Sequence, residues 1–98
     1  MNLHDFPRHP AGLEQVFLLD RDAGLLCRIL GLYAARGLDV LHADYAYAAR
    51  DVMKLRVSVA ADAADGTQDR VRVLVEKAST LVGVLAACEH EAEQRRAA

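Results

Sequence analysis

The segment from Val16 to Val40, VFLLDRDAGLLCRILGLYAARGLDV, constrains the fold of this chain more than any other part of the sequence. It holds an apolar run, an acidic turn that contains a glycine, a stretch with helical periodicity, and a second extended run. A short apolar run with β-favouring residues is typical of a buried strand, and apolar residues at i, i+3, i+4 and i+7 are typical of an amphipathic helix. The segment therefore predicts a strand, a turn, a helix and a second strand in direct succession.

The first strand is expected over residues 14–19, and the helix that follows it is expected to end at Gly37, because glycine commonly terminates helices. The apolar stripe of this helix consists of Leu26, Ile29, Leu30 and Tyr33. Arg28 and Arg36 fall away from that stripe. The pattern predicts a helix with one face in the core and the opposite face in solvent.

Two further strands are expected to form a hairpin. Residues 40–49 and residues 54–60 both alternate between two faces, which is the pattern of half-buried strands. Arg50 and Asp51 lie between these segments and fit a hairpin turn. On the first of the two strands, one face is expected to carry Leu41, Ala43, Tyr45 and Tyr47, and the other Val40, His42, Asp44 and Ala46.

The last third of the chain predicts a second helix and a fourth strand. Asp65 and Gln68 have the spacing of a capping box, in which Asp65 accepts hydrogen bonds from free N–H groups at the start of the helix. Residues 82–88, VGVLAAC, are expected to form the fourth strand. The apolar stripe of the second helix is Val71, Leu74, Val75, Ala78 and Leu81.

This order of elements predicts an α+β fold, the ferredoxin-like βαββαβ sandwich, in which two helices cover one face of a four-stranded antiparallel sheet. A chain of 98 residues has room for one such core. We expect the domain to span residues 13–90. A loose lead-in with Pro7 and Pro10 is expected over 1–12, and a polar tail over 91–98.

Composition excludes several functional classes. The 53% hydrophobic content argues against disorder, and a net charge of -2 gives no basic surface for a nucleic acid. The first ten residues lack the apolar core of a secretory signal, and no run approaches the roughly 18 apolar residues of a membrane span. Cys27 and Cys88 lack a zinc or redox spacing. We therefore expect a cytoplasmic protein with two buried free thiols and no metal or cofactor.

The turn between the first strand and the first helix is the main candidate for a binding site. Free N–H groups and the positive end of the helix dipole at such a position attract anions. A zwitterionic ligand would place its carboxylate on these groups or on Arg21, and its ammonium against Asp20 or Asp22. The alternative interpretation is structural: Asp22 caps the helix, Asp20 and Arg21 are solvated, and Gly24 permits close packing.

The residues LLDRDAGLLCRILGLYAARGLDV and, later, KASTLVGVLAACE resemble the ACT domain, and most closely the regulatory small subunit of acetolactate synthase. The resemblance covers about three quarters of the chain, and its most specific features are the turn and Arg36-Gly37. The sequence departs from that family at Arg21, where asparagine is common, and at Ala23, where proline or serine is common. No counterpart of the second domain of longer small subunits is present, so a short ACT-only type or a free-standing sensor is implied.

The resemblance implies that two domains pair edge to edge and that an amino acid, often valine as a feedback inhibitor, binds at the first turn. A catalytic enzyme subunit is the implied partner. Carried over to this sequence, the implied ligand-binding residues are Asp20, Arg21, Asp22, Ala23, Gly24, Leu25 and Leu26.

Other residues offer weaker signals. His42 with Asp44, and Cys88 with His90, have a spacing of two but no third ligand, and zinc needs three or four. Tyr45 and Tyr47 lie on a strand that would be at the edge of this fold, and edge strands favour pairing with a second chain. We expect a homodimer through this edge. A monomer whose tyrosines cover the open sheet face is the alternative.

No catalytic residue is expected, because no nucleophile in the turn has a base beside it. An acylphosphatase-like hydrolase of this fold would need an arginine-bearing phosphate loop and an asparagine that positions water, but the only asparagine is Asn2, in the lead-in. The sequence thus predicts a non-catalytic, amino-acid-binding regulatory domain, with the regulatory subunit of acetolactate synthase in branched-chain amino acid biosynthesis as the more specific interpretation. The alternative is a dimeric structural or interaction module with a vestigial ligand pocket.

Overall fold

The computed structural model describes residues 12–60 and 66–91, and its elements follow the predicted order. The expected lead-in and tail lie outside the described residues except for Gly12 and Glu91, so the domain boundaries stay predictions. The strands are β1 (Gly12–Asp20), β2 (Val40–Ala49), β3 (Val52–Ala60) and β4 (Val84–Glu91), and the helices are α1 (Ala23–Ala35) and α2 (Thr67–Ser79).

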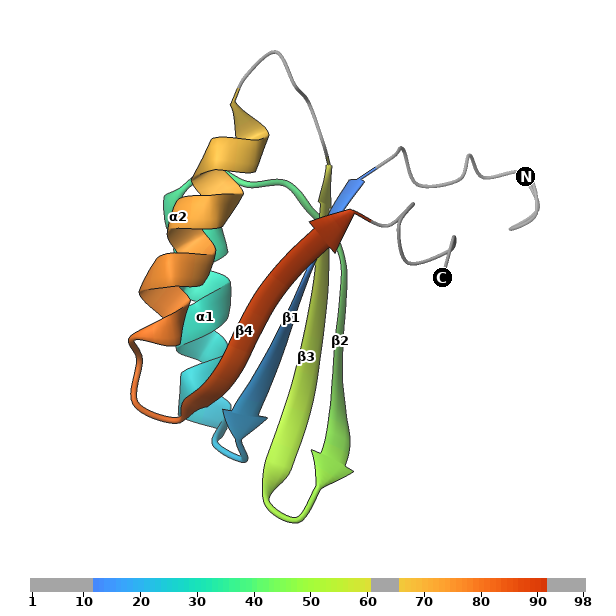
Figure 1. The fold of residues 1–98 in the computed structure, drawn as a ribbon, viewed down its shortest axis with the longest axis vertical. Coiled ribbons are helices and arrows are strands. Elements are labelled where there is room, and N and C mark those ends of the chain that lie inside the picture. The colour runs from blue at the N-terminus through green and yellow to red at the C-terminus, as the bar shows by residue number, and fades with distance from the viewer. Residues whose placement is uncertain (1–11, 61–65, 92–98) are drawn as a thin grey trace, which may run out of the picture.

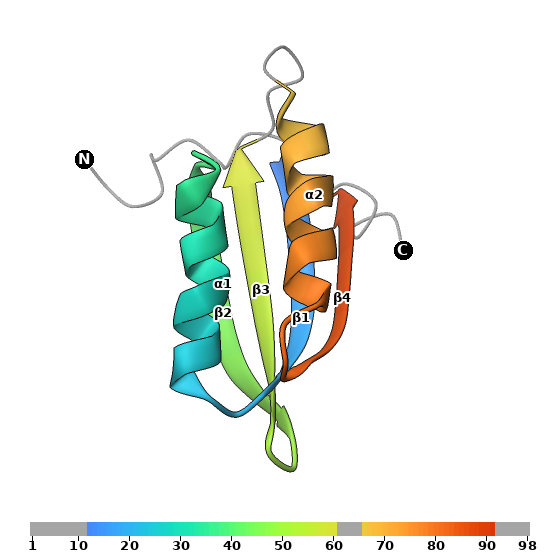
Figure 2. The same cartoon turned by 90° about the vertical axis from the view of Figure 1, so that its left-hand side faces the viewer.

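The four strands form one antiparallel sheet in the order β2-β3-β1-β4. Both helices lie on the same side of this sheet (Figure 1). In the turned view, α1 lies over the β2 side of the sheet and α2 over the β4 side (Figure 2). This arrangement confirms the ferredoxin-like βαββαβ sandwich.

Side chains of the central strand β1 alternate between the face of the sheet that the helices cover and the face that carries no helix. Phe17 and Leu19 are fully buried beneath the helices. Val16 and Leu18 point to the opposite face, which carries no helix, and are half-buried. Because β1 lies between β3 and β4, it leaves the sheet at its centre to enter α1.

Helix α1 confirms the predicted helix and its end. Gly37 has a φ of 64°, a left-handed conformation that glycine adopts readily, and it directly follows the C-cap Arg36. The fully buried line of α1 is Leu25, Ile29 and Tyr33. Leu26 and Leu30 of the predicted stripe are half-buried beside that line.

Helix α2 begins without the predicted capping box. Asp65 lies outside the described residues, and the N-cap position is held by Gly66, which has no side chain to accept a hydrogen bond. The predicted stripe is otherwise observed in the core: Val71, Leu74 and Ala78 are buried, and Val75 and Leu81 are half-buried against them.

Strands β2 and β4 each differ from the prediction at their first residues. Val40 lies opposite Val59 and His42 opposite Ser58, so Leu41 is an extra residue in β2 and Val40 turns to the helix-facing side. Strand β4 begins at Val84, later than predicted, because Gly83 with a φ of 99° belongs to the preceding turn.

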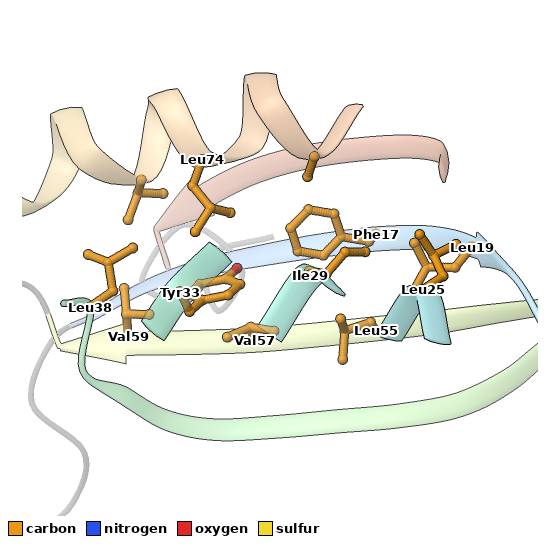
Figure 3. Close-up of a cluster of buried hydrophobic side chains, with 12 residues drawn as sticks. Phe17, Leu19, Leu25, Ile29, Tyr33, Leu38, Leu55, Val57, Val59 and Leu74 are labelled. Carbon is orange, nitrogen blue, oxygen red and sulfur yellow. The ribbon is translucent and has the colours of Figure 1, made fainter. Parts of the chain in front are cut away.

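The core lies between the sheet and the two helices (Figure 3). A buried hydrogen bond joins α1 to β1 here: the Tyr33 hydroxyl donates to Gln15 Oε1 over 2.8 Å. Gln15 Nε2 has no hydrogen-bond partner in the described part of the chain. The apolar members of the core are Phe17, Leu19, Leu25, Ile29, Leu38, Leu55, Val57, Val59, Val71, Leu74 and Ala78.

Candidate functional site

The predicted ligand-binding residues form one continuous turn at the end of the central strand. Asp20 ends β1, Arg21 lies between the strand and the helix, Asp22 is the N-cap of α1, and residues 23–26 form the first helical turn. The five residues from Asp20 to Gly24 are exposed, whereas the Leu25 side chain is 3% exposed and belongs to the core. A ligand at this turn would therefore contact the charged side chains and the backbone of residues 20–24. The buried Leu25 side chain packs the start of α1 against the core.

Three turns meet at this end of the sandwich, at the lower end of Figures 1 and 2. The backbone N–H of Asp20 donates to the Gly83 carbonyl over 2.8 Å, which joins the β1–α1 turn to the α2–β4 turn. The N–H of Arg21 donates to the Asp51 carbonyl over 3.1 Å, which joins it to the β2–β3 turn. The β1–α1 turn is thus held on both sides by backbone hydrogen bonds.

Asp22 acts as a helix cap, as the structural alternative for this residue proposes. Its carboxylate accepts from the Gly24 N–H over 2.9 Å, and its carbonyl accepts from the Leu25 and Leu26 N–H groups. A Cβ atom at Gly24 would lie 3.3 Å from the Asp22 carboxylate, so glycine leaves room for the cap. Three N–H groups at the start of α1 therefore already have acceptors within the turn.

The Arg21 guanidinium also has an intramolecular partner. It lies 3.3 Å from the carboxylate of Asp51, and both side chains are mostly exposed, at 63% and 72%. Sequence reasoning placed Asp51 in a hairpin turn but missed this contact. A left-handed φ of 56° at a non-glycine residue marks Asp51 as unusual in the structure, and no local pattern signals its distant partner.

Asp20 completes the charged surface of the turn. Its side chain lies close to Gly83, where a Cβ atom would be 3.4 Å from Asp20 Oδ2. In the described part of the chain, neither Asp20 nor Asp22 forms an ion pair. The turn therefore offers two exposed carboxylates, of which Asp22 is engaged as a cap, and one guanidinium shared with Asp51.

The other candidate residues do not assemble into a site. His42 and Asp44 are exposed on the face of the sheet that carries no helix, opposite Ser58 and Arg56. Across residues 12–60 and 66–91, no group of three or more metal-ligating side chains could hold a metal ion.

The two cysteines differ from expectation. Cys27 and Cys88 are both free, but both are exposed, so the prediction of buried thiols is wrong. Cys27 lies two positions after the buried Leu25 on α1, which turns it away from the core, and Cys88 lies on the edge strand β4.

The two tyrosines lie on an edge strand, as predicted. Tyr45 and Tyr47 are opposite Leu55 and Met53 of β3, and because Leu55 is buried beneath the helices, both tyrosines belong to the helix-facing side. Tyr45 packs against the core, and Tyr47 is 61% exposed. They therefore do not cover the open face of the sheet.

Within the described ranges, none of the helices has the length and apolar character needed to cross a membrane.

Comparison with known proteins identifies the fold class. The fold is similar to the C-terminal domain of the MgtC protein from Mycobacterium tuberculosis, with a TM-score of 0.70 and 15% identity, over 90% of this chain and 95% of that one. It is also similar to the ACT domain of GTP pyrophosphokinase from Chlorobium tepidum, with a TM-score of 0.65 and 11% identity, over 82% of this chain and 97% of that one. The chain therefore has an ACT-like fold.

The sequence itself matches no protein-family profile and no curated protein. The structural matches, at 15% and 11% identity, establish the fold and leave the ligand and the partner to be inferred from the site. They give no support to acetolactate synthase in particular.

Proposed function

We propose that this chain is a non-catalytic regulatory domain that binds an amino acid at the β1–α1 turn. The observation that carries the proposal is the exposure of Asp20 to Gly24 at the start of α1 in an ACT-like fold. A bound amino acid would bias the conformation of a catalytic partner, and coupling of this kind is typically ~1–3 kcal/mol. The resemblance of the turn and of Arg36-Gly37 to acetolactate synthase small subunits makes the catalytic subunit of that enzyme the specific partner that we propose.

The charges of the turn fit the two ends of a zwitterion. The Arg21 side chain is 63% exposed, and its guanidinium would donate hydrogen bonds to a ligand carboxylate in addition to Asp51 or in its place. The Asp20 carboxylate, which forms no ion pair with a described residue, would receive the ligand ammonium. Recognition would then rest on one cation and one anion that flank the start of α1.

Thermal melting with each of the common amino acids tests this proposal. One of them is expected to stabilise the domain, by about 2.7 kcal/mol at 100 times its Kd. Gly24→Leu should abolish this ligand-induced stabilisation, because the leucine side chain would fill the space next to the Asp22 carboxylate. Gly31→Leu, at an exposed position of the same helix with no atom within 4 Å of its Cβ position, should keep it. An unaltered shift in Gly24→Leu would place the ligand elsewhere.

The second candidate function is a structural or interaction module with a vestigial pocket. The observation that favours it is the intramolecular engagement of Asp22 as a helix cap and of Arg21 with Asp51. If none of the amino acids shifts the melting midpoint, the binding proposal fails and this alternative replaces it.

In either case we propose a homodimer through the edge strand β2 near Tyr45 and Tyr47. The strand is ten residues long, contains no lysine or proline that would block edge pairing, and leaves Val40 and Tyr47 exposed at 37% and 61%. Light scattering at micromolar concentration should give the mass of two chains. Tyr47→Glu should shift this toward one chain, whereas Val73→Glu on α2 should not. A wild-type mass of one chain would contradict the pairing.

A further inference from the structure

We draw no further inference here: the strongest candidate, the exposed apolar surface of Val82 in the α2–β4 turn and Leu85 at the start of β4, supports no proposal because nothing in the structure shows what covers it.

Discussion

Replacing Gly83 with alanine is expected to lower the free energy of unfolding by about 2–5 kcal/mol. Gly83 has a φ of 99°, where a side chain strains the backbone by roughly 1–2 kcal/mol. A Cβ atom there would also lie 2.9 Å from Leu25 Cδ2, and because Leu25 is buried it has little room to move. Overpacking of this kind adds about 1–3 kcal/mol. Urea denaturation measures the sum.

Two other glycines separate the strain from the packing. Gly66 has a φ of 73° but no atom within 4 Å of its Cβ position, so Gly66→Ala should show the strain alone. Gly31 lies within α1 with the same open space, so Gly31→Ala should stabilise the domain by up to about 1 kcal/mol. Equal losses for Gly83→Ala and Gly66→Ala would show that the α2–β4 turn does not pack on Leu25.

This experiment also bears on the candidate site. The Gly83 carbonyl accepts a hydrogen bond from the Asp20 N–H. Leu25, which the new Cβ atom would contact, lies in the first turn of α1 with its side chain in the core. A shift of the α2–β4 turn would therefore move the first residue of the proposed ligand-binding turn. A Gly83→Ala variant that stays folded should lose amino-acid binding together with stability.

The sequence was sufficient to predict the fold because strands and helices leave different periods in it. The alternation of residues 54–60 and the helical spacing of residues 71–78 survive in the structure as buried lines. Ile29 and Tyr33 of the predicted α1 stripe are buried, but the stripe begins at Leu25 and not at Leu26. These are adjacent leucines, and only packing shows that Leu25 is the buried one. Which of the two leucines is buried depends on how the helix lies on the sheet.

Features set by contacts between distant segments were not predictable. Leu41 is an extra residue of β2 only in relation to its pairing with β3, which the sequence of β2 alone does not reveal. The N-cap of α2 is Gly66, which has no side chain that would mark it as a cap. In the candidate site, the order of elements located the turn, but Asp51 and Gly83 reach it from other turns. The exposure of Cys27 likewise follows from which face of α1 meets the core.

Replacing Tyr33 with alanine should cost about 3–5 kcal/mol, the usual loss for a large buried aromatic side chain. Tyr33 is 1% exposed and comes from the last full turn of α1, where it packs against the core and bonds to Gln15 of β1. Tyr33→Phe isolates the hydroxyl. Gln15 Nε2 already lacks a described partner, and this variant would take the donor from Gln15 Oε1 as well, at a cost of about 1–3 kcal/mol.

A double-mutant cycle then decides whether the hydrogen bond or the packing dominates. Tyr33→Phe combined with Gln15→Leu removes the buried amide together with the hydroxyl, so the double variant should be more stable than Tyr33→Phe alone. The coupling energy from urea denaturation should lie at about 0.5–3 kcal/mol. Tyr47→Phe, at a position that is 61% exposed, is the control and should stay within about 0.5 kcal/mol of wild type. Additive losses at Tyr33 and Gln15 would mean that the buried hydrogen bond does not hold α1 to β1, and that apolar packing holds the helix on the sheet at this point.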